Sequence, residues 1–471
     1  MNDTHAYFDV HQEMFWQGDH VVYHQAGGYA RIATIVNKIR TEISGNCLFC
    51  DCGDTLHGTF PALSTNGQAM IPILNSLGLD AMTTHWEFAY GPTVFKQRIA
   101  ELNYPMLANN VFDKKTKKPV FQSYAVKEIG GLRIGLIGIA SNIVDKTMPP
   151  SFSEGIYFTL GKDELPPIID LLRIKEKCDL IVLLSHLGFT QDMKLVSEVS
   201  GIDVCLSGHT HNRLYKPVLS GKTLIIQSGC HGSFLGRLDL VVDGGHIIDY
   251  RHQLIEVEST VQPDPVIDDL VKQALAPYKD FLAEVVGETS TALNRGTTME
   301  TTMDNFLLQA LIESTGAQIA FSNGWRFGAP VIPGRITLND LYNIIPMNPP
   351  VSTVELTGEE IKEMLEENLE RTFSCDPYNQ MGGSVKRCLG LNVYFKIETP
   401  PGHRIQKIFA GNSEVQPDQY YSAAFVTMQG VPQKFGRNRE NKSERTIDAM
   451  RKYLSNHHPA SAELRGTFIA V

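Results

Sequence analysis

The sequence predicts an α/β protein of two domains, on three observations. Its 471 residues are too many for one domain of about 150 residues. Hydrophobic residues make up 42% of the chain and charged residues 20%, a mixture that builds a buried core and excludes a disordered chain. In the first half, short apolar runs end in polar clusters rich in His, Asp and Gly, which is typical of buried strands covered by helices on both faces.

The first domain is expected to alternate strands and helices. A helix is predicted over residues 28–40, where Ile32, Ile35, Val36 and Ile39 recur at helical spacing. Residues 11–24, which include several histidines, are expected to form a loop. The predicted strands are residues 47–50, 132–139, 180–184, 204–206, 224–227 and 237–242. In parallel sheets of this kind, functional side chains gather at the carboxyl ends of the strands.

The pattern changes near residue 258. Pro263, Asp264 and Pro265 are typical helix-start residues, and a helical pattern follows over 266–286, interrupted at Pro277. We interpret residues 259–286 as a linker helix between a first domain, 1–258, and a second domain, 287–471. The second domain is expected to contain helices over 302–315 and 357–371 and strands over 391–397 and 421–427.

Composition limits the partners and the compartment. The formal net charge of −10 argues against nucleic acid, and no apolar stretch reaches the roughly 20 residues that span a bilayer. Eight cysteines in so long a chain do not form a disulfide framework. No basic-then-apolar leader is visible, which predicts a cytoplasmic protein. The alternative is that residues upstream of Met1 are missing from the chain, in which case a secretion signal stays open.

Histidines and aspartates form a candidate metal site. Asp3 and His5 are two residues apart on an extended segment and therefore point the same way. The other candidates end or follow apolar runs and are Asp54, His85, His186, His209 and His211. Mixed nitrogen and oxygen ligands suit borderline transition metals. The set is large enough for two metals that share a bridging carboxylate, an arrangement that activates a bridging water and clamps an in-line displacement at phosphorus.

The order of these motifs resembles that of the calcineurin-like metallophosphoesterases. Asp-x-His, Gly-Asp, a His-bearing segment ending in Glu, Ser-His and Gly-His-x-His follow one another along the chain. The second half resembles the substrate domain of the 5′-nucleotidase/UDP-sugar hydrolase branch, through residues 300–305, 322–326, 334–337 and 356–358. The resemblance implies a four-layer αββα sandwich followed by a C-terminal α/β substrate domain.

The resemblance also implies roles for individual residues. One metal would be held by Asp3, His5, Asp54 and His211, and the second by Asp54, His85, His186 and His209. The two divalent metals would be Mn²⁺ or Zn²⁺, with Fe as a further candidate. Arg295 and Arg326 would meet the substrate oxyanion, because the planar guanidinium donates two parallel hydrogen bonds. His57, after the Gly-Asp turn, is a third catalytic candidate. The implied substrate-binding residues are Asn323, Gly324, Arg326, Gly382 and Gly383.

The chain departs from the ordinary nucleotidases at residues 84–89. These read Thr-His-Trp-Glu-Phe-Ala, where the nucleotidases have Gly-Asn-His-Glu-Phe-Asp. His85 therefore replaces a metal-binding Asn, Trp86 the catalytic His, and Ala89 its Asp partner. Met347 stands where a nucleobase-stacking aromatic is expected, and the Gly-Gly-Asp-Gly-Tyr loop is absent around residues 427–436. Residues 85–91 and 376–383 are similar to the Sox-type thiosulfohydrolases, which share this fold.

Three functions remain after this comparison. The first is a hydrolase of small nucleotide-type phosphoesters that uses a metal-bridging hydroxide, with neither nucleic acid nor membrane as a partner. The second is a thiosulfohydrolase that releases sulfate from a cysteine S-thiosulfonate on a carrier protein. The third is a non-catalytic member that binds metal and ligand. Loss of the His–Asp pair favours leaving groups that need little protonation, since a thiol has a pKa near 8.5 and water one of about 15.7.

Overall fold

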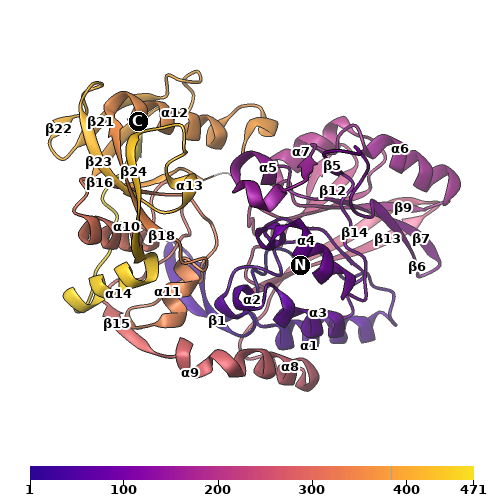
Figure 1. Ribbon diagram of the computed structural model, residues 1–471. Helices are drawn as coiled ribbons and strands as arrows, with labels where there is room; N and C mark the ends of the chain where they lie inside the picture. The colour runs from indigo at the N-terminus through magenta and orange to yellow at the C-terminus, as the bar shows by residue number, and fades with distance from the viewer. Residues whose placement is uncertain (383) are drawn as a thin grey trace. The chain divides into compact units, whose positions relative to one another are not determined.

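The chain folds as two α/β units, as the sequence predicts. A computed structural model describes residues 1–382 and 384–471 (Figure 1). Gly383, an implied substrate-binding residue, lies outside the described residues. By the contacts between residues, unit 1 consists of Met1–His11 and Gln25–Pro277, and unit 2 of Gln12–His24 and Tyr278–Val471.

Unit 1 is built around a six-stranded sheet with the strand order β11-β12-β10-β9-β7-β6. Strands β7, β9, β10 and β12 are parallel, and the edge strands β6 and β11 are antiparallel to their neighbours. Every residue of β9 is buried, which explains why the sequence of this strand is an apolar run that ends in Ser185. The four parallel strands confirm the predictions for these segments. The bounds are Tyr124–Ile129 (β6), Leu132–Ile139 (β7), Leu180–Ser185 (β9), Val204–Ser207 (β10), Val218–Ser220 (β11) and Thr223–Ile226 (β12).

Three two-stranded sheets complete the β-structure of unit 1. The long antiparallel hairpin of β13 and β14 includes the strand predicted at 237–242. Of the strand predicted at 47–50, only Cys50 lies in a strand, in the parallel pair of β3 and β4. In Figure 1, helices α6 and α7 lie on one side of the strands of unit 1, and α1, α3 and α8 lie on the other. The bounds are Cys50–Asp51 (β3), Ala81–Met82 (β4), Val111–Asp113 (β5), Ile156–Phe158 (β8), Phe234–Asp243 (β13) and His246–Glu256 (β14).

The helices of unit 1 follow the apolar pattern of the sequence. Helix α1 buries Ile32 and Val36, as the helical spacing predicts. Helix α8 begins where Asp264 accepts hydrogen bonds from the backbone of Val266 and Ile267. The bounds are Tyr29–Glu42 (α1), Phe60–Ser64 (α2), Ile71–Ser76 (α3), Gly91–Ala100 (α4), Val144–Thr147 (α5), Leu165–Asp170 (α6), Phe189–Glu198 (α7) and Pro265–Leu275 (α8).

The predicted helix over 266–286 is shorter than expected. Helix α8 ends at Leu275, a short helix α9 covers Lys279–Leu282, and Val285–Thr289 forms strand β15. Pro277 explains the break, because proline has no backbone N–H to continue a helix. Strand β15 pairs with β17, Gly334–Thr337.

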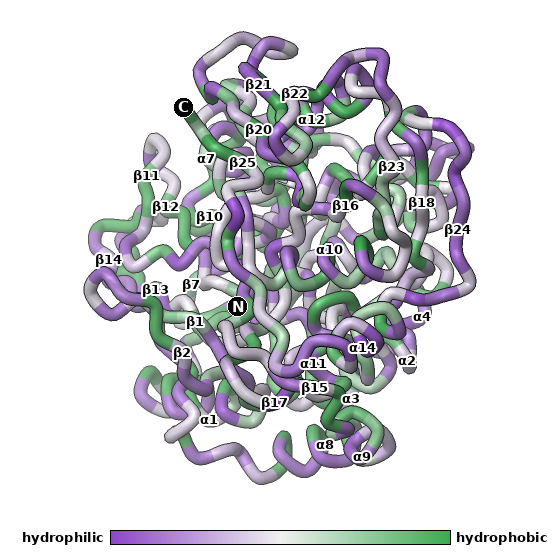
Figure 2. Tube along the Cα trace, turned by 90° about the vertical axis from the view of Figure 1, so that its left-hand side faces the viewer, coloured by the Kyte–Doolittle hydropathy of each residue, from purple (hydrophilic) through white to green (hydrophobic). Residues whose placement is uncertain are grey.

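Unit 2 contains a five-stranded sheet with the order β19-β16-β23-β18-β24 and a four-stranded sheet with the order β22-β21-β20-β25. The edge strand β24 is largely hydrophilic in Figure 2, and its charged side chains oppose pairing with another chain. The strands are Ile319–Ser322 (β16), Pro350–Thr357 (β18), Arg387–Leu389 (β19), Leu391–Phe395 (β20), Ile405–Ala410 (β21), Ser413–Glu414 (β22), Tyr420–Phe425 (β23), Arg437–Arg445 (β24) and Phe468–Ala470 (β25).

Helices α10 and α12 of unit 2 begin at strong N-caps. The Thr301 side chain accepts from the Asp304 backbone at the start of α10, and Thr357 forms a reciprocal capping box with Glu360 at the start of α12. Both helices occupy the segments that the sequence predicts. The helices are Thr302–Thr315 (α10), Leu338–Ile344 (α11), Gly358–Phe373 (α12), Thr427–Gly430 (α13) and Thr446–Asn456 (α14).

Residues 11–24, expected to be a loop, instead belong to a β-hairpin. Its strands are β1, His11–Gln17, and β2, His20–Ala26. Most of this hairpin belongs to unit 2, where Asn294 Nδ2 donates to the Tyr23 hydroxyl at 2.7 Å. The rings of Phe15 and His24 stack with centroids 3.7 Å apart. Asn294 is distant in sequence from Tyr23, so local patterning does not reveal this contact.

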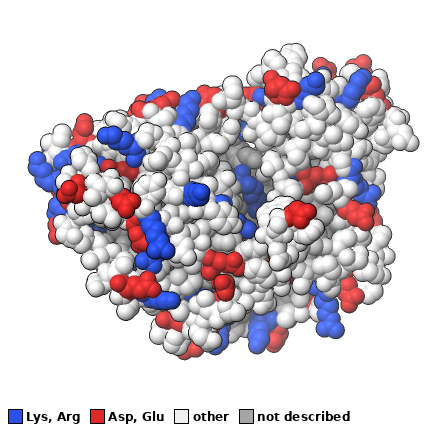
Figure 3. Space-filling view, turned by 180° about the vertical axis from the view of Figure 1, so that it is seen from behind, with Lys and Arg blue, Asp and Glu red and all other residues white. Residues whose placement is uncertain are grey.

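Surface charge is mixed. Figure 3 shows acidic and basic side chains interspersed over the visible face, consistent with a chain whose formal net charge is −10. None of the helices in the described ranges has the length and apolar character that crossing a bilayer requires.

Candidate metal centre

Backbone hydrogen bonds hold the Asp-x-His and Gly-Asp motifs side by side. The Asp3 backbone N–H donates to the Gly53 carbonyl at 2.9 Å, and that of His5 donates to the Asp54 carbonyl at 2.7 Å. The backbone N–H of Cys52 likewise donates to the Met1 carbonyl, at 3.0 Å. The first residues of the chain therefore run alongside the turn after β3, which places both carboxylates at one edge of the β-structure.

The remaining candidate ligands follow the carboxyl ends of parallel strands. His186 comes directly after β9, which ends at Ser185. His209 and His211 follow β10, and His85 follows β4 by three residues. Strands β9 and β10 are neighbours in the sheet, so their ends deliver these side chains to the same place.

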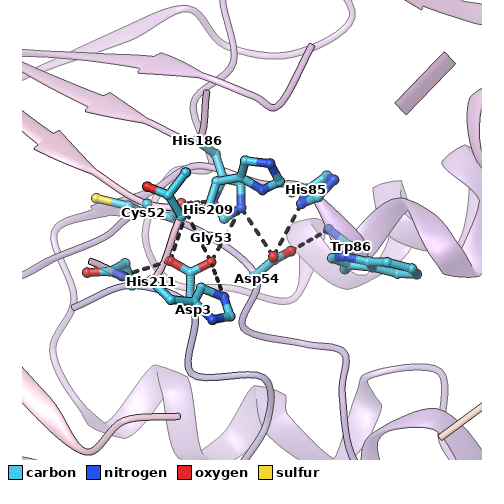
Figure 4. A network of polar contacts seen from close by, with 12 residues as sticks. Asp3, Cys52, Gly53, Asp54, His85, Trp86, His186, His209 and His211 are labelled. Carbon is cyan, nitrogen blue, oxygen red and sulfur yellow. Dashed lines mark hydrogen bonds and ion pairs between the residues drawn. The ribbon is translucent and has the colours of Figure 1, made fainter. Parts of the chain in front are cut away.

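All seven predicted metal ligands come together in unit 1. Figure 4 shows the Asp3 and Asp54 carboxylates surrounded by imidazoles. The seven ligands form two groups, and within each group the ligand atoms lie within 4.8 Å of one another. The first group is Asp54, His85, His186 and His209, and the second is Asp3, His5 and His211. This division matches the predicted one except that Asp54 appears in one group only.

Asp54 nevertheless lies against both groups. Its Oδ2 atom is 3.2 Å from His85 Nδ1 and 3.2 Å from His186 Nε2. The same oxygen is 3.9 Å from Nε2 of His5, which belongs to the second group. Asp3 likewise reaches across, with Oδ1 at 3.3 Å from His211 Nε2 and 3.6 Å from His186 Nε2. The geometry suits a carboxylate shared between two cations.

The residues present fit bound cations. His85 Nε2 is buried and has no hydrogen-bond partner among the described residues, as expected of an imidazole nitrogen that ligates a cation. The Cys52 carbonyl accepts from His186 Nδ1, which fixes the tautomer and leaves Nε2 facing the carboxylates. Buried carboxylates and imidazoles gathered in this way need a positive charge among them to offset their desolvation.

The backbone of the site is strained. Asp3, His5, Asp54, His209 and His211 have φ angles of 52°, 49°, 57°, 72° and 58°, in the left-handed region that residues other than glycine rarely adopt. Such conformations cost of order 1–3 kcal/mol each and cluster at functional sites, where surrounding structure holds them. Their coincidence with the predicted ligands supports a functional centre.

Burial and mutual contacts set the charges of the site. Burial lowers the pKa of His5 to about 3, which keeps this imidazole neutral. Burial would also lower the pKa of His186, but the carboxylates of Asp54 and Asp3 outweigh it and raise this pKa to about 10. Burial opposes ionisation of Asp54, yet His85 and His186 hold its pKa well below the usual range. A cation at this centre therefore competes with a proton for His186.

Glu87 is a buried residue whose role sequence reasoning missed. Its Oε1 accepts from the backbone N–H groups of Thr55 and Leu56 at 2.6 and 3.2 Å. Its Oε2 accepts from the Thr84 hydroxyl at 2.9 Å and the His85 backbone at 2.8 Å. One carboxylate thus joins the loop that carries Asp54 to the loop that carries His85. The only sequence feature that could have indicated this role is the position of Glu87 in the His-Trp-Glu motif, two residues after the candidate ligand His85.

Trp86 and His57 lie together beside the metal ligands. The Trp86 backbone donates to Asp54 Oδ1 at 2.7 Å, while its ring stacks on the His57 ring with centroids 5.2 Å apart. Burial lowers the pKa of His57 to about 4, against the opposing effect of the Asp54 carboxylate. His57, a predicted catalytic residue, is therefore a buried neutral imidazole at pH 7.

Arg295 lies inside unit 2, where its Nε and Nη1 atoms are hydrogen-bonded. It is 5% exposed, and its Nε donates to Asp304 Oδ1 at 3.1 Å. Its Nη1 donates to the carbonyls of Phe327 and Ile344 at 3.0 and 2.8 Å, and its Nη2 pairs with Asp304. The Nε and Nη1 atoms of Arg295 therefore already have buried partners, and the oxyanion-binding role that the resemblance implies stays a prediction.

The implied substrate-binding residues of unit 2 lie in neighbouring loops. Arg326 is half-buried and its Nη1 donates to the carbonyl of Gly382. Asn323 is also half-buried, and its amide lies 3.4 Å from Gln429 Oε1. A Cβ at Gly324 would lie 2.5 Å from the Val385 carbonyl, so only glycine fits there. The structure therefore brings the described members of this set together.

Comparisons with known proteins agree with this architecture. A family model described as the 5′-nucleotidase C-terminal domain matches residues 283–428. The trifunctional nucleotide phosphoesterase protein YfkN of Bacillus subtilis is 26% identical over 455 residues, which cover 86% of this chain but only 29% of YfkN. The 5′-nucleotidase of Diplobatis ommata is 26% identical over 426 residues, covering 81% of this chain and 71% of that protein.

Solved structures extend the likeness to the whole chain. The sulfate thiohydrolase SoxB of Thermus thermophilus, in complex with glycerol, is 25% identical with a TM-score of 0.93, covering 100% of this chain and 95% of that one. A 5′-nucleotidase precursor from Thermus thermophilus shares the fold, with 22% identity and a TM-score of 0.87 over 100% of this chain and 98% of that one. The named relatives support a hydrolase that acts on phosphoester bonds. In sequence and fold the chain is therefore similar to the calcineurin-like 5′-nucleotidases, and its residues 283–428 match the C-terminal domain of that family.

Proposed function

We propose that the protein is a metal-dependent hydrolase that cleaves phosphoester bonds in small nucleotide-type substrates. The observation that carries this proposal is the convergence of two buried ligand groups around the Asp3 and Asp54 carboxylates. The names of the nucleotidase and phosphoesterase relatives support the same reaction class.

Two divalent cations at this centre, Mn²⁺ or Zn²⁺ by the donor set, would supply positive charge that polarises a phosphoryl oxygen and activates water for attack. The chain's own residues hold this machinery in place. Asp54 lies against both ligand groups, Asp3 anchors the loop after β10, and Glu87 joins the loops of Asp54 and His85. Arg326 is the arginine proposed to bind the substrate oxyanion.

The residues around Trp86 favour substrates with good leaving groups. Trp86 and Ala89 occupy the positions of the catalytic His–Asp pair, and neither an indole nor a methyl group delivers a proton at neutral pH. A leaving group of low pKa departs without such help. Aryl phosphates and phosphoanhydrides are therefore preferred over simple alkyl phosphates.

A second function is favoured by one specific likeness. The solved sulfate thiohydrolase has a TM-score of 0.93 to this chain, and a sulfur leaving group, with a thiol pKa near 8.5, also departs with little protonation. The corresponding substrate would be a cysteine S-thiosulfonate carried by a partner protein. Its hydrolysis would release sulfate and leave the sulfur on the carrier cysteine.

Parallel assays separate these functions. The protein, loaded with Mn²⁺ or Zn²⁺, is tested on AMP, a UDP-sugar, p-nitrophenyl phosphate and a thiosulfonate. Phosphate release supports the first function, and sulfate release alone supports the second. Metal binding without hydrolysis of any substrate would identify a non-catalytic member. Asp54→Asn serves as the control that removes the shared carboxylate and should abolish every activity that belongs to this site.

A series of leaving groups tests whether the site, with Trp86 and Ala89 in place of a His–Asp pair, lacks a proton donor for the leaving group. Substituted phenyl phosphates should show rates that fall steeply as the pKa of the leaving phenol rises. The double variant Trp86→His with Ala89→Asp restores the two residue types of the ordinary nucleotidases and should flatten this dependence. A flat dependence in the unmodified protein would contradict the proposed preference.

A further inference from the structure

Two neighbouring strands end at equivalent serines just before the metal-ligating histidines. Strands β9 and β10 are parallel, and Ser185 pairs in register with Ser207. His186 directly follows the first serine, and His209 and His211 follow the second by two and four residues. The positions of three ligands therefore depend on how these two strand ends are held relative to each other.

One carboxylate ties the two strand ends together. Asp192, in the first turn of α7, is fully buried with 0% exposure. Its Oδ1 accepts from the Ser185 hydroxyl at 2.5 Å, and its Oδ2 accepts from the Ser207 hydroxyl at 2.6 Å. These two short bonds to a single carboxylate fix the spacing of the strand ends.

Gln227 extends the network around the loop of His209 and His211. It is 1% exposed, and its Nε2 donates to the Ser207 hydroxyl at 2.8 Å and to the Gly208 carbonyl at 2.7 Å. Its Oε1 accepts from the Thr210 hydroxyl at 3.1 Å and from the Asn212 backbone. Gln227 therefore bonds to residues on both sides of each histidine, whose backbones are left-handed.

We propose that Asp192 is a positioning residue for the metal centre, acting through Ser185 and Ser207 with Gln227 as its partner. The inference rests on the proposed metal-dependent function. Outer residues that orient metal ligands set the geometry in which the ligands meet the cation, and their loss typically costs about 10- to 100-fold in metal affinity or activity. Here the groups held in place are the loops that follow β9 and β10. His209 and His211 have strained backbones, which relax when the hydrogen bonds that support these loops are removed.

The chain contains a matched control at the opposite end of the same strands. Asp203 precedes β10, and its Oδ2 accepts from the Ile181 backbone of β9 at 2.6 Å and pairs with Arg173. It thus bridges the same two strands with the same functional group. At about 3.3 Å per residue, it lies roughly 13 Å from the strand ends that carry the ligands.

The test compares Asp192→Asn with Asp203→Asn in the full chain. In Asp192→Asn, an amide N–H₂ replaces one carboxylate oxygen and faces a serine hydroxyl, so one of the two bonds is lost or reversed. Mn²⁺ is titrated calorimetrically into the metal-free proteins, and urea unfolding is measured without metal. We expect Asp192→Asn to weaken Mn²⁺ binding by about 10- to 100-fold. Asp203→Asn should lower stability yet leave the Mn²⁺ affinity within about threefold of that of the unmodified protein.

The outcomes separate this inference from the proposed function. If Asp192→Asn binds Mn²⁺ as tightly as the unmodified protein, or if Asp203→Asn weakens binding equally, the inference is overturned. If the unmodified protein binds Mn²⁺ but hydrolyses no substrate, the proposed function fails while the affinity comparison still decides the inference. Should Asp192→Asn not fold, Ser207→Ala removes the same link, and its unchanged Mn²⁺ affinity would overturn the inference equally.

Discussion

Both carboxylate oxygens of Asp3 accept from the backbone N–H of His209, at 3.0 and 2.9 Å. Asp3 belongs to one ligand group and His209 to the other. The bond therefore links the start of the chain to the loop after β10 and couples the two groups. Loss of either residue should affect more than the cation that it would itself hold.

This coupling predicts the effect of Asp3→Asn. The substitution removes a negative ligand and places an amide donor near the N–H of His209, so it should disturb both ligand groups. We expect the metal content, measured by elemental analysis after dialysis, to fall by more than one cation per chain. Asp9→Asn, which changes an exposed carboxylate six residues away, should leave it unchanged. Loss of a single cation would show that the groups are independent.

Glu87→Gln should destabilise unit 1 although Glu87 is not itself a ligand. Glu87 accepts four hydrogen bonds, and glutamine leaves at least one of these buried donors facing an amide N–H₂. An unsatisfied buried donor costs about 1–3 kcal/mol. Urea unfolding without metal should show a loss of this size. The exposed Glu154→Gln should change stability by less than about 0.5 kcal/mol, and an equal effect in both variants would refute the role of Glu87.

Arg295 and Arg326 should behave differently despite the shared role that the resemblance implies. Arg295→Met leaves the buried Asp304 with Arg387 as its remaining guanidinium partner, so we expect a loss of about 3 kcal/mol in unfolding free energy. Arg326→Met removes a half-buried group and should cost less than about 1 kcal/mol, while raising KM for the phosphoester substrate. Denaturation curves and steady-state kinetics of both variants check this, and the reverse pattern would restore Arg295 as the substrate arginine.

Lys386 should make stability depend on pH above neutrality. Its Nζ is buried and donates to the carbonyls of Gln429 and Gly430 at 2.5 and 2.8 Å. Burial, together with the nearby Arg371 guanidinium, lowers its pKa from 10.5 to about 7. Between these values the unfolded chain holds a proton that the folded chain lacks, so the unfolding free energy rises with pH, by up to about 1.4 kcal/mol per pH unit.

Comparison with Lys386→Met isolates this contribution. The stability of the unmodified protein relative to the variant should increase from pH 7 to pH 9 and should level off below pH 7, where the lysine is charged in both states. Urea unfolding at each pH measures the difference. A difference that does not change with pH would mean that Lys386 is charged in the folded protein throughout this range.

Local sequence patterns predicted the elements that they encode directly. The apolar run of β9 and the helical spacing of apolar residues in α1 reflect which of their own side chains are buried. Such a pattern can be recognised in the sequence alone. The β1–β2 hairpin was not predicted, although only Gly18 and Asp19 separate its two strands. Its contact with Asn294 comes from the other half of the sequence, which local patterning does not reveal. The helix expected up to residue 286 is divided into α8, which ends at Leu275, and the short helix α9, and the strand that follows is fixed by pairing with β17.

The amino-acid sequence by itself determined the identity of the candidate ligands, since Asp and His side chains after strand-like runs have the chemistry and the spacing of a metal site. Only the tertiary structure decided which groups orient those ligands and which arginine is already engaged. Glu87, Asp192 and Arg295 act through hydrogen bonds to residues far away in the chain. The amino-acid sequence records only the type and spacing of residues. The partners of a buried hydrogen bond are determined only when segments distant in the sequence pack together.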